Sequence, residues 1–295
     1  MKKLKQIITQ IKSEAPTTPD EFNSLIWQLI CYPPKMQVRL QQEQFLNEAD
    51  KFNLKVNDKY FTKKELNVSG FIWGNGLRKV LITHGWGSKA ADFSDVVTEL
   101  LNINNLQVIA FDAPGNGSSG GDLSNLLLYV DTIKAIILKY GKPDILIGHS
   151  LGAMANIIAL KEMKFTPTLL ISLSPLIRLK ENFEQSMFTA GVSQLAQDIF
   201  LKSFQDKFKM SASNYNLSNY YIFDSPLNHW LAYDRNDQVS PYDYVEDFLL
   251  THSSVKSKNY ENSGHERIIK LPQAINDLVN IIKEALMNTK PVSKV

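Results

Sequence analysis

The chain has 295 residues, of which 44% are hydrophobic and 21% are charged, as in ordinary soluble globular proteins. Its 32 Lys and Arg residues nearly balance 30 Asp and Glu residues, and a net charge of +2 gives no sign of a basic surface for nucleic acid. Cys31 is the only cysteine, which excludes an intrachain disulfide and a cysteine metal cluster, and no apolar run is long enough for a membrane span, so we expect a cytoplasmic protein.

The first part of the chain, residues 1–60, is mostly polar with helical spacing of its apolar residues, and it predicts an N-terminal helical extension. The start MKKLKQIITQIK has a basic opening, but polar residues interrupt its apolar ones, so we expect an amphipathic helix and not a signal peptide. Pro33 and Pro34 end a second helical segment, because proline lacks an amide donor and disfavours helix in the preceding residue.

Short, continuous apolar runs alternate with helical segments from about residue 66 onward. Continuous runs are typical of strands that are covered on both faces of a sheet. The expected strands are 79–83, 107–111, 145–147 and 169–173, and the expected helices are 93–102, 123–139, 151–164 and 272–287. This alternation predicts an α/β core over 61–175 and 225–295, with a parallel sheet between two layers of helices.

The alternation stops over residues 176–224, where a phenylalanine-rich helical stripe occurs instead. Phe200, Phe204 and Phe208 lie four residues apart and therefore share one helix face. We expect this insertion to form a helical lid over the end of the sheet, with Phe200 and Phe204 as substrate-binding residues. The alternative is a peripheral helical hairpin without contact to any site.

The strongest chemical signal is Gly148-His149-Ser150-Leu151-Gly152, which lies between an expected strand and an expected helix. This is the context of a nucleophile elbow, a sharp turn that presents a serine at its tip. The crowded turn needs small residues two positions before and after the serine, and both are glycine. We therefore predict Ser150 as the nucleophile. The alternative is a glycine-rich turn with an inert serine.

A serine needs a general base to remove its proton, and His265 is the best candidate. The sequence has five histidines: His84, His149, His229, His252 and His265. Only His265 follows both the serine and a suitable acid, which gives the chain order Ser…Asp…His. His149 lies within the elbow and must point away from the serine, while His229 and His252 are expected to be structural or exposed.

The acid that orients the base is expected in a loop after a strand between Ser150 and His265. Residues 230–233 supply the strand, and Asp237 lies in the middle of the following loop, before a helix that starts after Pro241. Asp237 is the predicted acid. Asp234 and Asp243 are the alternatives.

An acyl-transfer site also needs fixed donors for the oxyanion. Leu151 directly follows the nucleophile and is expected to supply one backbone amide. Trp86, in His84-Gly85-Trp86-Gly87 after the strand at 79–83, is the expected second donor. The alternative for 84–87 is a plain strand-to-helix turn.

The chain resembles the α/β-hydrolase superfamily over about 66–290. The resemblance rests on five motifs in chain order: His84-Gly85-Trp86-Gly87, Asp112-Ala113-Pro114-Gly115-Asn116-Gly117-Ser118, the elbow, Asp237 and Gly264-His265. The similarity is greatest to small bacterial esterase-like members with a helical lid. The resemblance implies an eight-stranded, mostly parallel sheet with helices on both faces, a Ser–His–Asp triad and no cofactor. One departure is Asn116, where many members carry histidine in a structural turn.

The residue type of the nucleophile excludes several reaction classes of the superfamily. A serine excludes the dehalogenase-like and epoxide hydrolase-like members, which use aspartate, and His149 and Leu151 do not fit proline iminopeptidase-like members. We expect hydrolysis of a small-molecule carboxylic ester or thioester through an acyl-enzyme, with no metal, since no H-x-x-H or H-E-x-x-H spacing occurs. The alternatives are an acyltransferase that uses the same triad and a non-catalytic ligand-binding member of the fold.

Overall fold

A computed structural model describes residues 2–13 and 18–288, so residues 1, 14–17 and 289–295 of the expected extension and core lie outside the described residues. The strands are β1 (Asp50–Asn57), β2 (Glu65–Trp73), β3 (Arg78–Thr83), β4 (Leu106–Phe111), β5 (Ile145–His149), β6 (Leu169–Leu173), β7 (His229–Tyr233) and β8 (Lys256–Asn259). They form one eight-stranded sheet in the order β1-β2-β4-β3-β5-β6-β7-β8. The two pairs that β2 makes, with β1 and with β4, are antiparallel, and the pairs from β4 to β8 are parallel, as the sequence predicts.

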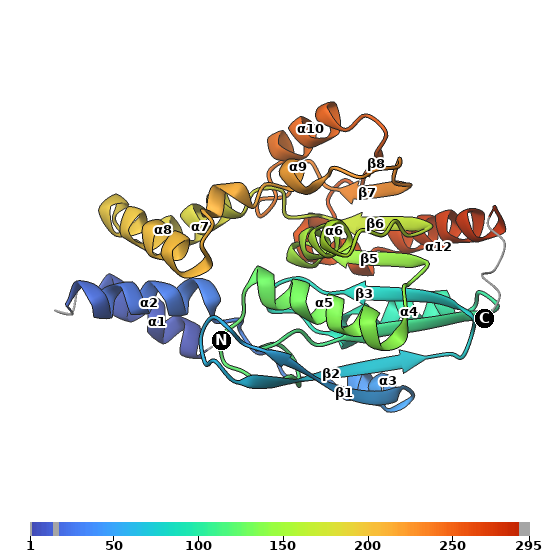
Figure 1. Cartoon of the computed structure of the whole chain (residues 1–295), viewed down its shortest axis with the longest axis horizontal. Coiled ribbons are helices and arrows are strands. Elements are labelled where there is room, and N and C mark those ends of the chain that lie inside the picture. The colour runs from blue at the N-terminus through green and yellow to red at the C-terminus, as the bar shows by residue number, and fades with distance from the viewer. Residues whose placement is uncertain (1, 14–17, 289–295) are drawn as a thin grey trace.

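Helices cover both faces of this sheet (Figure 1). The α-helices are α1 (Lys2–Lys12), α2 (Pro19–Cys31), α3 (Leu40–Asn47), α4 (Ser94–Leu101), α5 (Leu126–Tyr140), α6 (Leu151–Met163), α7 (Leu179–Thr189), α8 (Gln194–Phe208), α9 (Leu217–Tyr220), α10 (Tyr242–Thr251), α11 (Gly264–Arg267) and α12 (Pro272–Met287). Alternate residues of β3 face opposite layers: Leu81 packs with α5 and α6, whereas Val80 and Ile82 pack with α4 and α12. Burial on both faces explains the continuous apolar runs.

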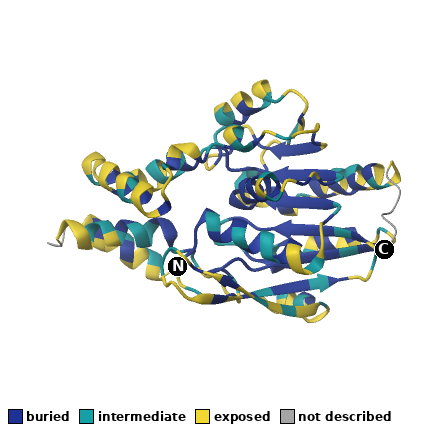
Figure 2. Cartoon of the chain, viewed as in Figure 1, coloured by how far each residue is buried: buried dark blue, intermediate teal, exposed yellow. Residues whose placement is uncertain are grey.

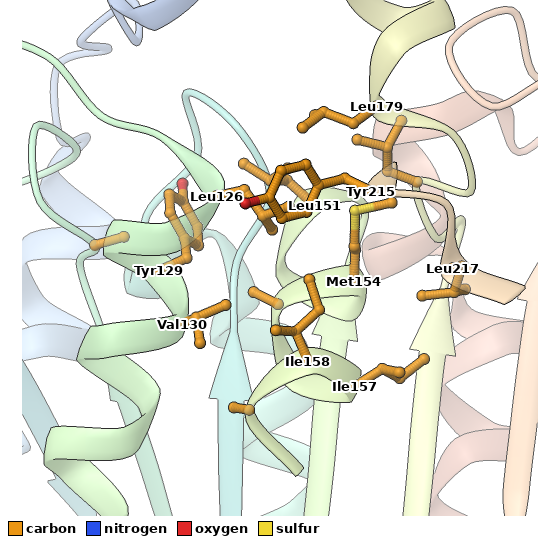
Figure 3. Close-up of a cluster of buried hydrophobic side chains, with 14 of the residues drawn as sticks. Leu126, Tyr129, Val130, Leu151, Met154, Ile157, Ile158, Leu179, Tyr215 and Leu217 are labelled. Carbon is orange, nitrogen blue, oxygen red and sulfur yellow. The ribbon is translucent and has the colours of Figure 1, made fainter. Parts of the chain in front are cut away.

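The buried core follows this layering. Figure 2 shows the central strands as buried and the outer helices as exposed on their outward sides. In Figure 3, side chains of α5 and α6, among them Val130 and Ile158, gather into one apolar cluster with Leu179 and Tyr215 of the segment 176–224. No helix in the described part of the chain is long and apolar enough to cross a membrane. The cytoplasmic location stays a prediction.

The segment 1–60 is not helical throughout, which corrects the expected extension. Its helices end at Asn47, and Asp50–Asn57 forms strand β1, which pairs with β2. Phe52, Leu54 and Val56 alternate with polar residues, and this period of two is typical of a strand that is buried on one face. The sheet therefore begins at Asp50 and not after residue 60.

Helix α2 of the extension packs against the helical insertion at 176–224, which follows the carboxyl end of β6. Helix α2 lies between α1 on one side and α7 and α8 on the other (Figure 1). Trp27 of α2 is central to this contact: its indole Nε1–H donates to Ser203 Oγ at 3.1 Å, and its ring lies 4.9 Å from Phe200 and 6.1 Å from Phe204 between centroids. Two segments far apart in the sequence thus form one helical layer.

Candidate active site

Ser150 occupies a strained turn between β5 and α6. Its φ of 52° and ψ of −121° are unusual for a residue with a side chain, and such strain is common at functional sites. A Cβ on Gly148 would approach Ala153 Cα to 2.5 Å, and one on Gly152 would approach the His84 carbonyl oxygen to 2.4 Å. The two glycines of the predicted elbow are therefore required by packing.

The three residues expected to form the triad lie in hydrogen-bond contact. His265 Nε2 is 2.8 Å from Ser150 Oγ, and His265 Nδ1 is 2.7 Å from Asp237 Oδ2. Because the carboxylate can only accept, Nδ1 carries the proton and Nε2 accepts the serine hydroxyl proton. This tautomer is the one that a general base for serine requires.

Asp237 is held as a carboxylate. Its Oδ1 accepts the amide protons of Val239 at 2.8 Å and Ser240 at 3.0 Å, while Oδ2 faces His265. Burial opposes ionisation of Asp237, but the bonds from His265 and from the two amides outweigh it and hold the pKa of the carboxyl below its ordinary value.

The alternative acids have other positions. Asp234 Oδ2 accepts a hydrogen bond from the Gly264 amide at 2.7 Å and so holds the turn that carries His265. Asp234 makes no hydrogen bond to the His265 imidazole among the described residues. Asp243 is exposed in the first turn of α10. The structure therefore brings Asp237, and neither alternative, to the base.

His149 has a positioning contact that the sequence did not indicate. Its Nε2 lies 2.9 Å from the carbonyl oxygen of His265 and donates to it. Burial, together with the neighbouring His265, lowers the pKa of His149 to about 3, so the imidazole is neutral. The sequence shows only that His149 points away from the serine, and no local pattern indicates its partner 116 residues further along the chain.

The expected oxyanion donors, Trp86 and Leu151, line a cavity together with Ser150. Among the described residues, no turn or loop carbonyl accepts a hydrogen bond from the backbone amide of Trp86 or of Leu151. Leu151 is also the first residue of α6, and the first amides of a helix have no acceptor within the helix. Hydrogen bonds on both sides of Trp86 hold its loop in place. Asn116 Oδ1 accepts from the Gly87 amide at 3.1 Å, and the Tyr129 hydroxyl donates to the Gly85 carbonyl at 3.1 Å. Two free amides beside a nucleophile can stabilise an oxyanion.

Two cavities meet at Ser150, and Ser150, Trp86 and Val239 line both. The first, here called the inner cavity, has a volume of about 230 Å³ and lies between α2, α5, α7 and α8. It is lined mainly by apolar side chains. The second, here called the outer cleft, has a volume of about 540 Å³, and its lining includes five charged residues: Arg39, Lys89, Asp92, Glu266 and Lys270. A bond cleaved at Ser150 would have chemically different surroundings on its two sides.

The structure separates the two candidate lid residues. Phe204 lines the inner cavity, whereas Phe200 is fully buried behind it against Trp27 and Phe183, which corrects its expected contact with substrate. The N-terminal extension also contributes to the wall through Leu29, Ile30 and Cys31, which the sequence did not indicate. Burial raises the pKa of the Cys31 thiol, so it is no rival nucleophile.

The sheet and the elbow define the class of this protein, which is a hydrolase with the α/β-hydrolase fold. A family model described as serine aminopeptidase, S33, matches residues 76–266. The chain belongs to this family.

Solved structures show the same fold. An esterase of Pyrococcus furiosus is 20% identical and superposes with a TM-score of 0.60 over 88% of this chain and 97% of that one. A putative lipase of Acinetobacter baumannii is 15% identical, with a TM-score of 0.58 over 86% and 99% of the two chains. Est1E of Butyrivibrio proteoclasticus, solved with ferulic acid, is 15% identical, with a TM-score of 0.57 over 78% and 100%. A search of curated proteins gave no match.

The buried histidines predict a marked loss of stability in mild acid. Burial lowers the pKa of His84, and it lowers the pKa values of His149 and His229 to about 3. In the unfolded chain each imidazole binds a proton below about pH 6.5, while the folded protein does not. The stabilising effect is therefore complete above pH 6.5 and declines as the pH falls towards 3, by up to roughly 1.4 kcal/mol per pH unit for each histidine.

Urea unfolding between pH 5 and 7.5 measures this effect. The free energy of unfolding should fall steadily below pH 6.5. In His229→Gln its slope against pH should be smaller, because the variant takes up about one proton fewer on unfolding. A free energy that is flat over this range would contradict the assignment of neutral buried imidazoles.

Proposed function

We propose that this protein is a serine hydrolase that cleaves a carboxylic ester or thioester through an acyl-enzyme on Ser150. The observation that carries the proposal is the continuous contact from Ser150 through His265 to Asp237, at 2.8 and 2.7 Å. A merely structural serine needs neither an oriented base nor a buried carboxylate behind it.

The geometry supports the usual sequence of steps. Ser150 Oγ attacks the acyl carbon while its proton passes to His265 Nε2, and the amides of Trp86 and Leu151 bind the oxyanion. His265 then gives this proton to the leaving alcohol or thiol as its bond to carbon breaks. A water molecule repeats the attack on the acyl-enzyme, again with His265 as the base, and releases the acid and free Ser150.

The cavities support an assignment of the two substrate parts. The inner cavity has no charged residue among the described residues that line it, which favours an uncharged acyl group there. Its volume is below the roughly 300–1,000 Å³ of pockets for drug-sized ligands, so the acyl group is expected to be short or of medium length. The outer cleft, whose lining includes charged residues, suits a polar leaving group.

An aminopeptidase is the second candidate, because the family description names one. Such an enzyme must bind the free amine of its substrate on the acyl side, and a buried ammonium requires a carboxylate partner. No carboxylate lines the inner cavity in the described part of the chain. We therefore favour an ester or thioester over an amino-terminal peptide bond.

A substrate screen tests the proposal. Purified protein is assayed with p-nitrophenyl esters of graded acyl length, acyl-CoA thioesters and aminoacyl p-nitroanilides, with Ser150→Ala as the control and detection of free acid to separate hydrolysis from acyl transfer. We expect ester or thioester hydrolysis that is lost in the control. Faster cleavage of anilides would support the aminopeptidase, and binding without turnover would contradict catalysis.

Phe204 is expected to limit the length of the acyl chain. Phe204→Ala should enlarge the inner cavity and shift the preferred acyl length upward, because each added methylene that becomes buried contributes roughly 0.8 kcal/mol, or up to about fourfold in kcat/KM. The profile of kcat/KM against acyl length measures this shift. Phe200→Ala is the matched control, since Phe200 lies one turn earlier on α8 and does not line the cavity. Identical profiles in both variants would place the acyl chain elsewhere.

A further inference from the structure

The Gly85 carbonyl lies in the loop that carries the proposed oxyanion donor Trp86, and three hydrogen-bond donors surround it. The Ser88 amide donates to it across a tight turn at 3.3 Å. The Tyr129 hydroxyl donates to it at 3.1 Å, and His84 Nδ1 lies 2.7 Å from it. A carbonyl oxygen has two lone pairs, so three donors on one oxygen fix the direction in which this carbonyl points.

The contacts of His84 show that its ring donates to this carbonyl. The Ala113 amide donates to His84 Nε2 at 2.9 Å, and a backbone amide can only donate, so Nε2 carries no proton. Burial holds the pKa of His84 below its ordinary value, so the ring is neutral and its single ring N–H is on Nδ1. His84 and the turn are neighbours of Gly85 in the sequence, whereas Tyr129 comes from a separate helix.

Tyr129 lies near the start of α5, 44 residues after Gly85. Its side chain is fully buried, and Figure 3 shows the hydroxyl oxygen pointing toward the carboxyl end of the strands. A buried hydroxyl without an acceptor would be unfavourable, and the Gly85 carbonyl supplies that acceptor. Tyr129 lines neither the inner cavity nor the outer cleft, so it does not contact a substrate bound there.

The direction of the Gly85 carbonyl decides where the Trp86 amide points. The two groups belong to one trans peptide, and in a planar trans peptide the C=O and the N–H point in opposite directions. Because the carbonyl points toward the Tyr129 hydroxyl, the Trp86 N–H points away from it. The loop also lies against the nucleophile, since a Cβ added at Gly85 would be 3.0 Å from Ser150 Cβ.

We propose that Tyr129 is a positioning residue for catalysis. Its hydroxyl holds the Gly85 carbonyl so that the Trp86 N–H stays directed at the oxyanion that forms on the acyl group attached to Ser150. This inference rests on the proposed function and adds to it a residue that acts on the reaction only through a peptide bond.

Tyr129→Phe tests the proposal, because it removes the hydroxyl and keeps the buried ring. With p-nitrophenyl butyrate we expect kcat to fall by roughly three- to tenfold, the range that one hydrogen bond produces. The Ki of 1,1,1-trifluoropentan-2-one, which forms an oxyanion adduct with an activated serine, should rise by the same factor. The Ki of p-nitrophenyl butyl ether, which has no carbonyl group, should not change. A purely structural role would lower the Tm and leave all three constants as they are.

Tyr260→Phe is the matched control. Tyr260 is also buried, its hydroxyl donates to Asp277 Oδ2, and it lines neither cavity. The variant should lose stability while kcat and both Ki values stay at the wild-type level. A fall in kcat equal to that of Tyr129→Phe would show that any lost tyrosine hydroxyl has this effect, which would overturn the inference.

A second experiment tests whether Tyr129 acts through the Trp86 amide. Indole-3-lactic acid in place of Trp86 keeps the side chain and the Gly85 carbonyl but turns the amide into an ester without an N–H. This replacement should lower kcat by roughly 10²- to 10³-fold, as the loss of an oxyanion donor does. Adding Tyr129→Phe to it should then change kcat no further. An undiminished kcat with the ester, or a full additional loss from Tyr129→Phe, would contradict the proposed route.

The outcomes distinguish this inference from the proposed function. Turnover by the wild type with the same kcat and the same ketone Ki in Tyr129→Phe would overturn the positioning role alone. If the wild type turns over no ester, the proposed function fails, and the ketone still decides the role of Tyr129. Fluorine NMR then measures its adduct with Ser150 in both proteins, and equal affinities, or no adduct in either, would overturn the inference.

Discussion

His265→Ala is expected to lower kcat by roughly 10⁵- to 10⁶-fold, the range seen when a triad loses its histidine. His265 Nε2 is the group within reach of the Ser150 hydroxyl, at 2.8 Å, and alanine leaves the serine without a base. The fold should survive, because His265 is partly exposed in the short helix α11 and its ring contacts are confined to the site. Steady-state kinetics and the circular dichroism spectrum of the variant measure both expectations.

Two other histidines provide the controls. His229 is buried, with its ring bonded to Tyr221 Oη at 3.0 Å and Ser172 Oγ at 2.9 Å, so His229→Ala should destabilise the protein while folded molecules keep their kcat. His252 ends α10, and His252→Ala should change little. Loss of turnover in either folded variant, with activity retained in His265→Ala, would show that the base has been assigned wrongly.

Asp237→Asn is expected to lower kcat by about 10⁴-fold with little change in structure. An asparagine amide can present its nitrogen to His265, which then places the imidazole proton on Nε2 and removes the acceptor for the serine proton. The loss should appear in kcat more than in KM, because Asp237 does not line either cavity.

Asp234→Asn is the matched comparison, since Asp234 bonds to the Gly264 amide in the turn before His265. Weakening this bond should reduce the free energy of unfolding, by about 1–3 kcal/mol for one buried charged acceptor, and reduce kcat much less than Asp237→Asn. A larger kcat effect from Asp234→Asn would identify Asp234 as the orienting acid.

The sequence was sufficient where a local pattern determines structure. The continuous apolar runs predicted β3 to β6, and the glycines around Ser150 predicted the elbow, because close packing at that turn leaves no room for a Cβ at either position. Strand β1 was missed, although Phe52, Leu54 and Val56 alternate, because the polar composition of the segment hid a strand with one buried face.

Tertiary contacts were beyond the sequence pattern. The four-residue spacing of Phe200 and Phe204 places both on one face of α8, but only the packing of α2 shows that Phe204 reaches the inner cavity and Phe200 does not. Likewise, the contribution of α2 to the cavity depends on Trp27 lying against α8, a contact across 176 residues. The hydrogen bond from His149 to the His265 carbonyl also joins residues far apart in the sequence, so no local pattern indicates it.

Covalent labelling with a fluorophosphonate identifies the nucleophile, because only an activated serine hydroxyl reacts quickly with such a probe. The labelled protein is digested, and the modified residue is located by mass spectrometry. We expect one rapid modification on Ser150 that is absent in Ser150→Ala and strongly slowed in His265→Ala. Labelling of a different residue that persists in Ser150→Ala, or no labelling of the folded wild-type protein, would contradict this expectation.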